Sequence, residues 1–404
     1  MTKKRVVVTG IGVISSIGIG KDAFWDSLIK GKSGVSKITA YDTSEHATHN
    51  GGEVRGFDPE SYINKRKIRF MGRTSQFAIA AAKLAISDAG AEIDMLKTSI
   101  AVGTTMGEAC QLEKMDKLWL GSGDASIDKE LFFQYLTNSI SANLAIELGA
   151  SGSNRIFGNA CAAGNYAIGY GYDVVKNGKA DVAIVGGADS FSRIAFTGFN
   201  QFAAVAPDKC QPFDKNRKGI IVGEGAGILI LESLENAKKR EADIYGEILG
   251  YGLSCDAYNM TNPQTDGIVK CMESALRDAG TDPDEIDYIS THGTGTILND
   301  KAECAAIKRV FGDRYKKIPA NSIKSMLGHT MAGASALEAI SCCLTLKEGI
   351  IPPTINYEAP DPECDIDCVP NRAREHNVDI ALNNSYAFGG NNACLVFKRV
   401  NKRR

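Results

Sequence analysis

The strongest indication of chemistry in this sequence is a cysteine between a predicted strand and a helix of small residues. Cys161 lies in the run Gly158-Asn159-Ala160-Cys161-Ala162-Ala163-Gly164. A thiol at a helix N-terminus faces the positive end of the helix dipole, which lowers its pKa and favours the nucleophilic thiolate. The small residues after it let another backbone or a ligand approach closely, as in the strand–turn–helix elbows of serine hydrolases. Cys161 could be one buried cysteine among eleven, but this setting favours a nucleophile.

Two histidines occupy comparable positions in the second half of the chain. His292, in the run Thr291–Thr296, directly follows an apolar strand, and ligands collect at the carboxyl ends of strands in open α/β sheets. His329 lies in a loop that opens a second helix of small residues, at Gly328–Ala334. The other three histidines, at positions 46, 49 and 376, lie in polar stretches, where a structural role suffices. We therefore expect His292 and His329 to face Cys161.

Further polar groups flank these histidines. Lys324 precedes His329 by five residues, and Glu303 lies in the helix that follows His292. A buried lysine is costly without a carboxylate partner, so we expect a Lys324–Glu303 pair that orients the site and balances its charge. The glycine-rich loop Asn383–Asn392 lies between two predicted strands, and its backbone N–H groups are suited to stabilising an oxyanion.

Short apolar strands alternate with helical segments along the chain, which is typical of an α/β protein with buried sheets. The expected strands are Val6–Thr9, Ser99–Gly103, Arg155–Gly158, Val182–Gly186, Ile228–Leu231 (after a Gly-rich bend at Gly223–Gly227), Tyr245–Gly252, Ile286–Ser290, Pro319–Asn321, Ile380–Asn383 and Cys394–Lys398. The expected helices are Asp22–Lys30, Thr74–Ala89, Ala162–Lys176, Leu234–Arg240, Gly267–Ala279, Asp300–Phe311 and Ala332–Lys347.

The order of elements repeats, and it divides the chain into two halves. The first, 1–240, carries Cys161, and the second, 241–404, carries His292, Lys324 and His329. No linker rich in Pro, Gly or Ser separates the halves, so we expect them to pack across a shared core.

Composition excludes several classes of function. The 404 residues carry a net charge of −2, which gives no overall field for nucleic acid, and no apolar run is long enough to span a bilayer. The odd count of eleven cysteines, behind a start that lacks the features of a secretory signal, predicts a reducing, cytoplasmic location. Cys364 and Cys368 lack a second Cys/His pair at zinc spacing, so we expect no metal.

One local cluster of basic residues stands out against this neutral background. It consists of Lys65, Arg66, Lys67, Arg69 and Arg73. Charge runs usually form a solvated helix surface, but this one would also suit an acidic partner.

In their order along the chain, Cys161, His292, Lys324, His329 and the Phe388-Gly389-Gly390 loop resemble the elongating β-ketoacyl-acyl-carrier-protein synthases. The resemblance runs from Val7 to Phe397. It implies the thiolase fold, in which two similar αβαβα halves form a five-layered unit, and a homodimer.

The resemblance also implies a role for each residue. Cys161 would accept an acyl group, and its N–H and that of Phe388 would form an oxyanion hole. His292 and His329 would donate hydrogen bonds to the thioester oxygen of a malonyl unit, and Lys324, held by Glu303, would orient the histidines. Decarboxylation then leaves an enolate that attacks the acyl-enzyme.

Further residues match positions that contact the substrate or its carrier in this family. Thr294, Thr296 and Gly389 would line the path of the phosphopantetheine arm. Met106 would project across a dimer interface to close the acyl pocket. Arg66, Lys67 and Arg69 would dock an acidic acyl carrier protein, which brings the substrate on its 4'-phosphopantetheine, so the enzyme itself needs no bound cofactor.

Four positions depart from the family pattern. Asn159 replaces the usual Thr before Ala160, and Ala387 replaces the first glycine of the gating loop, where alanine tolerates fewer backbone conformations. Ile220 stands where a second gating Phe is common, and Gln211 where a carrier-contacting Arg is common. These changes leave both fatty acid and specialised polyketide or polyene pathways open.

Three alternatives share the fold. A biosynthetic thiolase needs a second catalytic cysteine, but Cys394 lies in a predicted strand rather than a glycine-rich loop. The initiating type of synthase has one histidine and an asparagine where this chain has His292 and His329. A non-catalytic chain-length factor lacks the nucleophile, which is present here as Cys161, although such a subunit could be the partner in a heterodimer.

Overall fold

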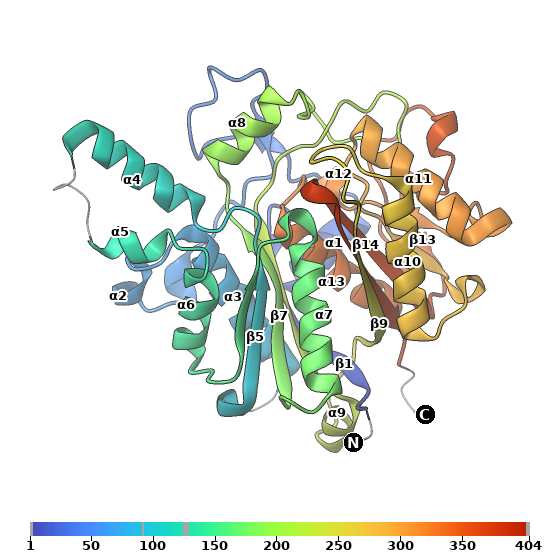
Figure 1. Ribbon diagram of the computed structural model, residues 1–404, viewed down its shortest axis with the longest axis horizontal. Helices are drawn as coiled ribbons and strands as arrows, with labels where there is room; N and C mark the ends of the chain where they lie inside the picture. Colours follow the sequence, from blue (N-terminus) through green and yellow to red (C-terminus); the bar gives the residue numbers. More distant parts are fainter. Residues whose placement is uncertain (1–2, 91–92, 124–128, 401–404) are drawn as a thin grey trace.

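A single hydrogen-bonded sheet runs through the molecule. The computed structural model describes residues 3–90, 93–123 and 129–400. The sheet has eleven strands, in the order β11-β10-β14-β15-β9-β1-β8-β7-β5-β6, with β2 added beside β1 (Figure 1). The strands are β1 (Val6–Ser15), β2 (Gly18–Ile19), β5 (Thr98–Gly103), β6 (Asn154–Phe157), β7 (Val182–Asp189), β8 (Gly225–Ser233), β9 (Gly246–Cys255), β10 (Tyr288–Ser290), β11 (Ala320–Asn321), β14 (Ile380–Ala387) and β15 (Asn391–Lys398).

Helices cover both halves of this sheet. On the N-terminal half, α3 packs against β1, β7 and β8, and on the C-terminal half α10 packs against β9 and β15 and also against α11. Between the two halves lie α7 and α13, which contact each other and strands from both sides. The helices are α3 (Arg73–Ala89), α7 (Ala163–Lys176), α10 (Thr265–Ala279), α11 (Ile297–Phe311) and α13 (Ala332–Glu348).

These contacts give five alternating layers of helix and sheet, as the resemblance implies. The sheets of the two halves are not separate. Val6–Val8 of β1 pairs with Gly246–Ile248 of β9, and this pairing joins them into one continuous sheet. The predicted division at 240/241 falls between α9 (Leu234–Lys239) and β9.

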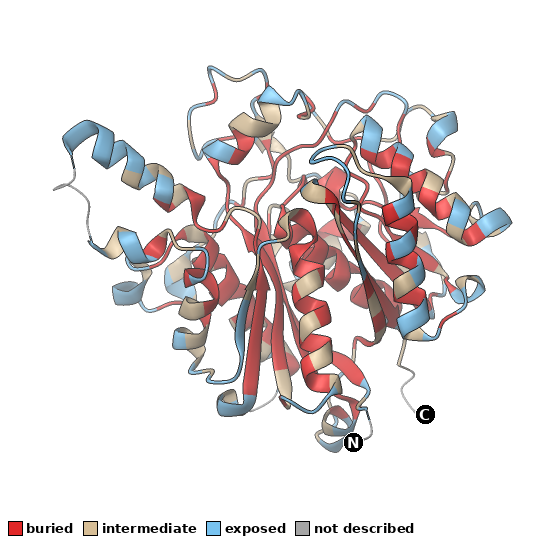
Figure 2. Ribbon diagram, viewed as in Figure 1, coloured by how far each residue is buried: buried red, intermediate tan, exposed pale blue. Residues whose placement is uncertain are grey.

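The core confirms that the halves share their interior. The largest buried cluster joins side chains from β1, β8, α7, α13 and β15, including Val8, Leu231, Ile340 and Phe397 (Figure 2). A glycine lets α7 and α13 pack closely at this point. A Cβ on Gly164 of α7 would lie only 2.7 Å from the Ala332 carbonyl oxygen of α13. The small residues that follow Cys161 thus let two central helices meet.

All the predicted strands and helices exist, with shifted ends. The bend expected at Gly223–Gly227 is shorter, because β8 already begins at Gly225. Besides the one-turn helices α2 (Lys65–Ile68) and α12 (Lys324–Leu327), four longer helices among the described residues were missed, since their exposed apolar side chains obscure the helical period. They are α4 (Ala109–Ser122), α5 (Lys129–Gln134), α6 (Ser139–Leu148) and α8 (Arg193–Gln201).

The remaining elements are short or peripheral. They are β3 (Ser36–Lys37), β4 (Asn50–Gly51), β12 (Ile350–Ile351), β13 (Arg374–Glu375), α1 (Lys21–Ile29), α2 (Lys65–Ile68) and α12 (Lys324–Leu327). Within the described ranges, no helix combines the length and apolar character needed to cross a bilayer.

Candidate active site

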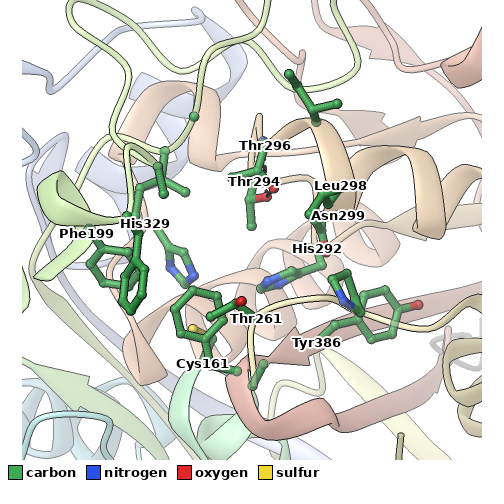
Figure 3. Close-up of a pocket in the computed structure, with 18 of the residues that line it drawn as sticks. Cys161, Phe199, Thr261, His292, Thr294, Thr296, Leu298, Asn299, His329 and Tyr386 are labelled. Carbon is green, nitrogen blue, oxygen red and sulfur yellow. Dashed lines mark hydrogen bonds between the residues drawn. The ribbon is translucent and has the colours of Figure 1, made fainter. Parts of the chain in front are cut away.

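A cavity of about 310 Å³ contains the three residues whose spacing first indicated chemistry. Figure 3 shows Cys161 below the two imidazoles of His292 and His329, with Thr294 and Thr296 above them. The lining comes from both halves of the chain: Cys161, Phe199, Phe202–Ala204 and Lys218–Ile220 from the first, and Asn259–Thr261, Pro263, His292, Thr294, Thr296–Asn299, His329, Tyr386–Phe388 and Gly390 from the second.

Cys161 lies in a short 3₁₀ turn, Ala160–Ala162, that leads into α7. The preceding Ala160 has φ +47°, a left-handed conformation that is uncommon for alanine and typical of a strained elbow. Ser385 Oγ donates a hydrogen bond to the Cys161 carbonyl oxygen at 3.2 Å and ties the elbow to β14. Strand, turn and helix therefore fix the thiol at the base of the cavity.

The expectation of a lowered thiol pKa is wrong. Burial raises the pKa of Cys161 to about 12, and the nearby Lys324 opposes this shift only in part. A charged sulfur loses more hydration in the cavity than the helix N-terminus returns. At neutral pH the resting nucleophile is a thiol.

His292 follows β10, and the backbone around it is fixed by a buried carboxylate. Glu303 accepts hydrogen bonds from the N–H groups of His292 and Gly293, both at 2.8 Å. Burial raises the pKa of Glu303 to about 8, and these two donors oppose the shift. Glu303 thus orients the loop that carries His292.

The predicted Lys324–Glu303 pair is wrong. Lys324 is buried and forms its ion pair with Glu338, which lies in α13. Its ammonium also donates to the His292 carbonyl oxygen at 2.6 Å and lies 3.3 Å from His292 Nδ1. Glu303 instead uses both its oxygens on backbone donors. The carboxylate that balances Lys324 thus comes from the helix that His329 opens.

Glu338 could have been found from the sequence. It is the only charged residue in the otherwise apolar and small-residue stretch Ala332–Leu346. A lone carboxylate in a buried helix requires a partner, and Lys324 is the neighbouring lysine on the N-terminal side. Burial raises the pKa of Glu338 to about 7, against the lowering effect of Lys324.

His329 is held by backbone bonds on both sides. Its N–H donates to the Ile221 carbonyl oxygen at 2.6 Å, and its carbonyl accepts from Gly223 N–H at 2.9 Å. Its ring Nδ1 accepts a hydrogen bond from Met331 N–H at 3.2 Å. The ring centroids of His292 and His329 are 5.5 Å apart, with an angle of 81° between the planes.

Both imidazoles are arranged as neutral hydrogen-bond donors. Burial, together with the charge of Lys324, lowers the pKa of His292 and of His329 well below the usual range. In each ring Nδ1 faces a donor, Lys324 Nζ for His292 and Met331 N–H for His329, so we assign the proton to Nε2. The site therefore offers two N–H donors beside one thiol.

The Phe388–Gly390 loop follows β14 and forms one wall of the cavity. Phe388 is 37% exposed, and its ring lies 5.6 Å from Phe199 and 6.3 Å from Phe202. Gly389 has φ +80°, which favours glycine, and its N–H donates to the Met260 carbonyl oxygen at 2.9 Å. Ala387 is extended at φ −135°, ψ 158°, so this conformation does not need the usual glycine.

The upper part of the cavity is apolar with a few polar groups. The hydroxyls of Thr294 and Thr296 are 2.9 Å apart, and Ile220 is a buried residue of the lining. Apart from the two histidines, Lys218 is the one basic residue in the lining, and it is exposed.

Other expected residues lie outside the lining. Met106 is half-buried in the loop after β5. Arg66 and Lys67 lie in α2 and Arg69 at its C-terminal end, all on the surface; Lys67 pairs with Glu147 at 2.8 Å and Arg69 lies over the Phe70 ring. Gln211 is buried and donates to the Asn356 carbonyl oxygen at 2.9 Å.

One residue of the site, Tyr386, had no usable sequence signal. It is buried in β14, with its ring edge-on to His292 at 5.7 Å. Arg73, grouped with the basic cluster, lies outside the cavity lining and pairs with buried Glu224 at 2.7 Å. Cys394 is buried in β15 and does not line the cavity, which removes the second cysteine that a thiolase needs.

Comparison with known proteins places this geometry in a family. Residues 3–237 match the N-terminal domain of β-ketoacyl synthases, and residues 245–358 match the C-terminal domain. The 3-oxoacyl-[acyl-carrier-protein] synthase 2 of Synechocystis sp. is 40% identical, over 99% of both chains. That of Staphylococcus aureus strain COL is 38% identical, over 98% of both chains.

Solved structures agree. The chain is similar to the ishigamide ketosynthase/chain length factor, with a TM-score of 0.96, 47% identity, and coverage of 99% of this chain and 100% of that one. It is also similar to a type II polyketide ketosynthase in complex with its acyl-carrier protein, with a TM-score of 0.91, 34% identity, and coverage of 99% and 100%. The fold is thiolase-like, and the chain belongs to the β-ketoacyl synthase family.

Proposed function

We propose that this protein extends acyl chains by decarboxylative condensation of an acyl group on Cys161 with malonyl-acyl carrier protein. The products are 3-oxoacyl-acyl carrier protein and CO2. The observation that carries the proposal is the convergence of Cys161, His292 and His329, from three distant stretches of chain, on one cavity. A nucleophile and two neutral N–H donors are the groups that this reaction requires.

In the loading step, the Cys161 sulfur attacks the carbonyl carbon of an acyl thioester on the carrier. A new C–S bond forms between Cys161 and the acyl carbon, and the bond from that carbon to the carrier sulfur breaks. The proton lost by the Cys161 thiol is matched by the proton that the departing carrier sulfur gains, so the carrier leaves as a thiol. The N–H groups of Cys161 and Phe388 would hold the tetrahedral oxyanion. One nucleophile used for loading and then for condensation gives ping-pong kinetics.

In the condensation step, the malonyl thioester loses CO2 and its negative charge moves to the thioester oxygen. The Nε2–H groups of His292 and His329 would donate hydrogen bonds to that oxygen. Lys324 and Glu303, which bond to the backbone of His292, would hold this residue in position. The enolate carbon then bonds to the acyl carbon, and the Cys161 thiolate departs and is reprotonated.

The substrate would arrive on the 4'-phosphopantetheine of an acyl carrier protein, and the enzyme would hold no cofactor of its own. Thr294 and Thr296, which line the cavity, would flank this arm, and Gly389, between the lining residues Phe388 and Gly390, would lie beside it. Arg66, Lys67 and Arg69 would form the docking surface for the acidic carrier. Among the described residues, no three His, Cys, Asp or Glu side chains are grouped as metal ligands.

A role in polyketide or polyene elongation is favoured by one comparison. The chain shares 47% identity with the ishigamide ketosynthase/chain length factor, against 40% with a synthase 2 of Synechocystis. We therefore propose assembly with a second subunit of the same fold, either a copy of this chain or a chain-length-factor-like partner, in the cytoplasm. Met106 would face that partner.

The chemistry is tested by trapping the acyl-enzyme. The wild-type protein is incubated with acyl carriers of different chain length, and intact-protein and peptide mass spectrometry locate the adduct. The acyl group should map to Cys161, and product appears when malonyl carrier is added. A Cys161→Ala variant that still extends chains would end the proposal. Size exclusion of the protein alone shows whether it pairs with itself.

A further inference from the structure

A buried carboxylate outside the cavity binds the backbone on which His329 depends. Asp189, the last residue of β7, is fully buried and has no role in the proposed reaction. Its Oδ1 accepts from Thr104 Oγ1 at 2.8 Å and from Met106 N–H at 2.9 Å. Its Oδ2 accepts from Thr105 N–H and from Ala332 N–H, each at 2.8 Å. We infer that Asp189 is a positioning residue that holds His329 in its donor form and links it to the loop after β5. This inference deepens the proposed function and rests on it.

The need for such a positioning residue lies in the backbone between His329 and α13. Met331 has φ +55° and ψ −125°, a region that is strained for a residue with a side chain. Such strain persists only when the surroundings hold it on both sides. On one side Met331 N–H is bonded to His329 Nδ1, and on the other Ala332 N–H is bonded to Asp189 Oδ2.

The consequence falls on the tautomer of His329. With Met331 N–H pointing at Nδ1, the ring keeps its proton on Nε2, which is the nitrogen left to serve the cavity. Without the Asp189 bond, the strained Met331 can relax and turn its N–H away. His329 then also populates the tautomer with the proton on Nδ1, and in that fraction the cavity loses one of its two donors.

The same carboxylate reaches a second segment of chain. Thr104–Met106 connects β5 to α4, and three donors from this segment converge on Asp189. Thr104 Oγ1 also accepts Gly107 N–H at 2.9 Å, so the loop is organised around this one contact. A change in the loop after β5 is thereby transmitted to the N-terminus of α13, and hence to His329.

Asp189→Asn is the direct test, because an amide keeps the volume but offers one acceptor oxygen where the carboxylate offers two. Thr104→Val is the second variant, which removes one donor to Asp189 without approaching His329. Glu108→Gln is the matched control: Glu108 is also buried and accepts Ser75 N–H at 2.7 Å and Thr74 N–H at 3.3 Å, at the start of α3.

Two rates and one spectrum are measured for each variant. Single-turnover loading of Cys161 should stay near the wild-type rate, while condensation with malonyl carrier on the loaded enzyme should slow by about 10- to 100-fold in Asp189→Asn. Thr104→Val should show the same selective loss, smaller in size, and Glu108→Gln should lower stability without changing the ratio of the two rates.

Labelling with ¹⁵N-histidine reports the tautomer directly, since the chain has five histidines and His329→Ala identifies the signal. His329 should be protonated on Nε2 in the wild type and in Glu108→Gln, and a mixture of tautomers in Asp189→Asn. An unchanged tautomer in both Asp189→Asn and Thr104→Val would overturn the inference, as would equal losses in loading and condensation. If the wild type extends no acyl chain, the proposed function fails, and the spectrum still decides the role of Asp189.

Discussion

The ion pair between Lys324 and Glu338 gives the sharpest test of the site's construction. Both side chains are 1% exposed, and each is a charge that the interior tolerates only with its partner. Glu338→Leu removes one charge and leaves the Lys324 ammonium buried. Breaking a buried pair in this way costs about 3–5 kcal/mol.

The expected cost lies near the lower end of this range. Lys324 keeps the His292 carbonyl oxygen at 2.6 Å as an acceptor after Glu338 is lost. We therefore expect a loss of about 3 kcal/mol, which reduces the ratio of folded to unfolded protein by roughly a hundredfold. Adding Lys324→Met replaces the pair by two apolar side chains and should return stability to near the wild-type value.

The assay is urea unfolding followed by circular dichroism for the wild type, both single variants and the double variant. Glu303→Leu, alone and with Lys324→Met, is the matched control, because Glu303 is equally buried but bonds to backbone. Lys324→Met should rescue Glu338→Leu and fail to rescue Glu303→Leu. The opposite pattern would restore the Lys324–Glu303 pair expected from the sequence and refute the assignment made from the structure.

Four further predictions concern the reaction and the buried carboxylates. His329→Ala should slow condensation by about 100- to 1,000-fold and leave loading of Cys161 in place, as measured by single-turnover mass spectrometry. Because the pKa of Cys161 is raised to about 12, its alkylation by iodoacetamide should quicken with every step from pH 6 to 9, and a plateau near pH 7 would contradict this. Lys218→Glu should raise the KM for acyl carrier at low salt with little change in kcat, since it reverses the charge at the cavity entrance. Burial raises the pKa of Glu108 from 4.5 to about 7. The contribution of this residue to stability is therefore complete below about pH 4.5 and is lost as the pH rises through 7. The destabilisation caused by Glu108→Gln should shrink over that window, by about 3 kcal/mol at most.

The sequence was sufficient to predict the convergence of Cys161, His292 and His329. Cys161 and His292 lie where a strand leads into a helix, and His329 lies in the loop that opens α13; the carboxyl ends of strands collect at the same edge of the sheet. It was also sufficient for the eight-residue and longer elements with clear apolar runs, such as β7 and α13. What these predictions share is that they depend on local periodicity and on chain order.

The errors share a different cause, because each depends on which way a side chain points inside the folded protein. The sequence marks Glu338 as the lone charge of Ala332–Leu346, but Glu303 is also a candidate partner for Lys324 by its position, and the fold shows that Glu338 faces the ammonium. The pKa of Cys161 depends on the depth of burial, which outweighs the helix N-terminus. Asp189 ends an apolar strand and precedes polar residues, so nothing in its local pattern marks the four donors that its oxygens bind.

The cost of these buried charges explains why the region around the histidines is built as it is. An apolar core of similar volume would be at least as stable as one that holds Lys324 and Glu338. A donor facing Nδ1 in each ring holds the proton of the neutral imidazole on Nε2, and a donor in the interior must itself be held in place. Lys324 meets this need for His292 and requires Glu338, whereas the Met331 N–H meets it for His329 and requires a strained backbone held by Asp189. Two different devices thus give the same tautomer. Stability and condensation should therefore separate when Lys324 and Glu338 are both replaced by apolar residues, because the fold survives while the His292 donor to the enolate is no longer fixed.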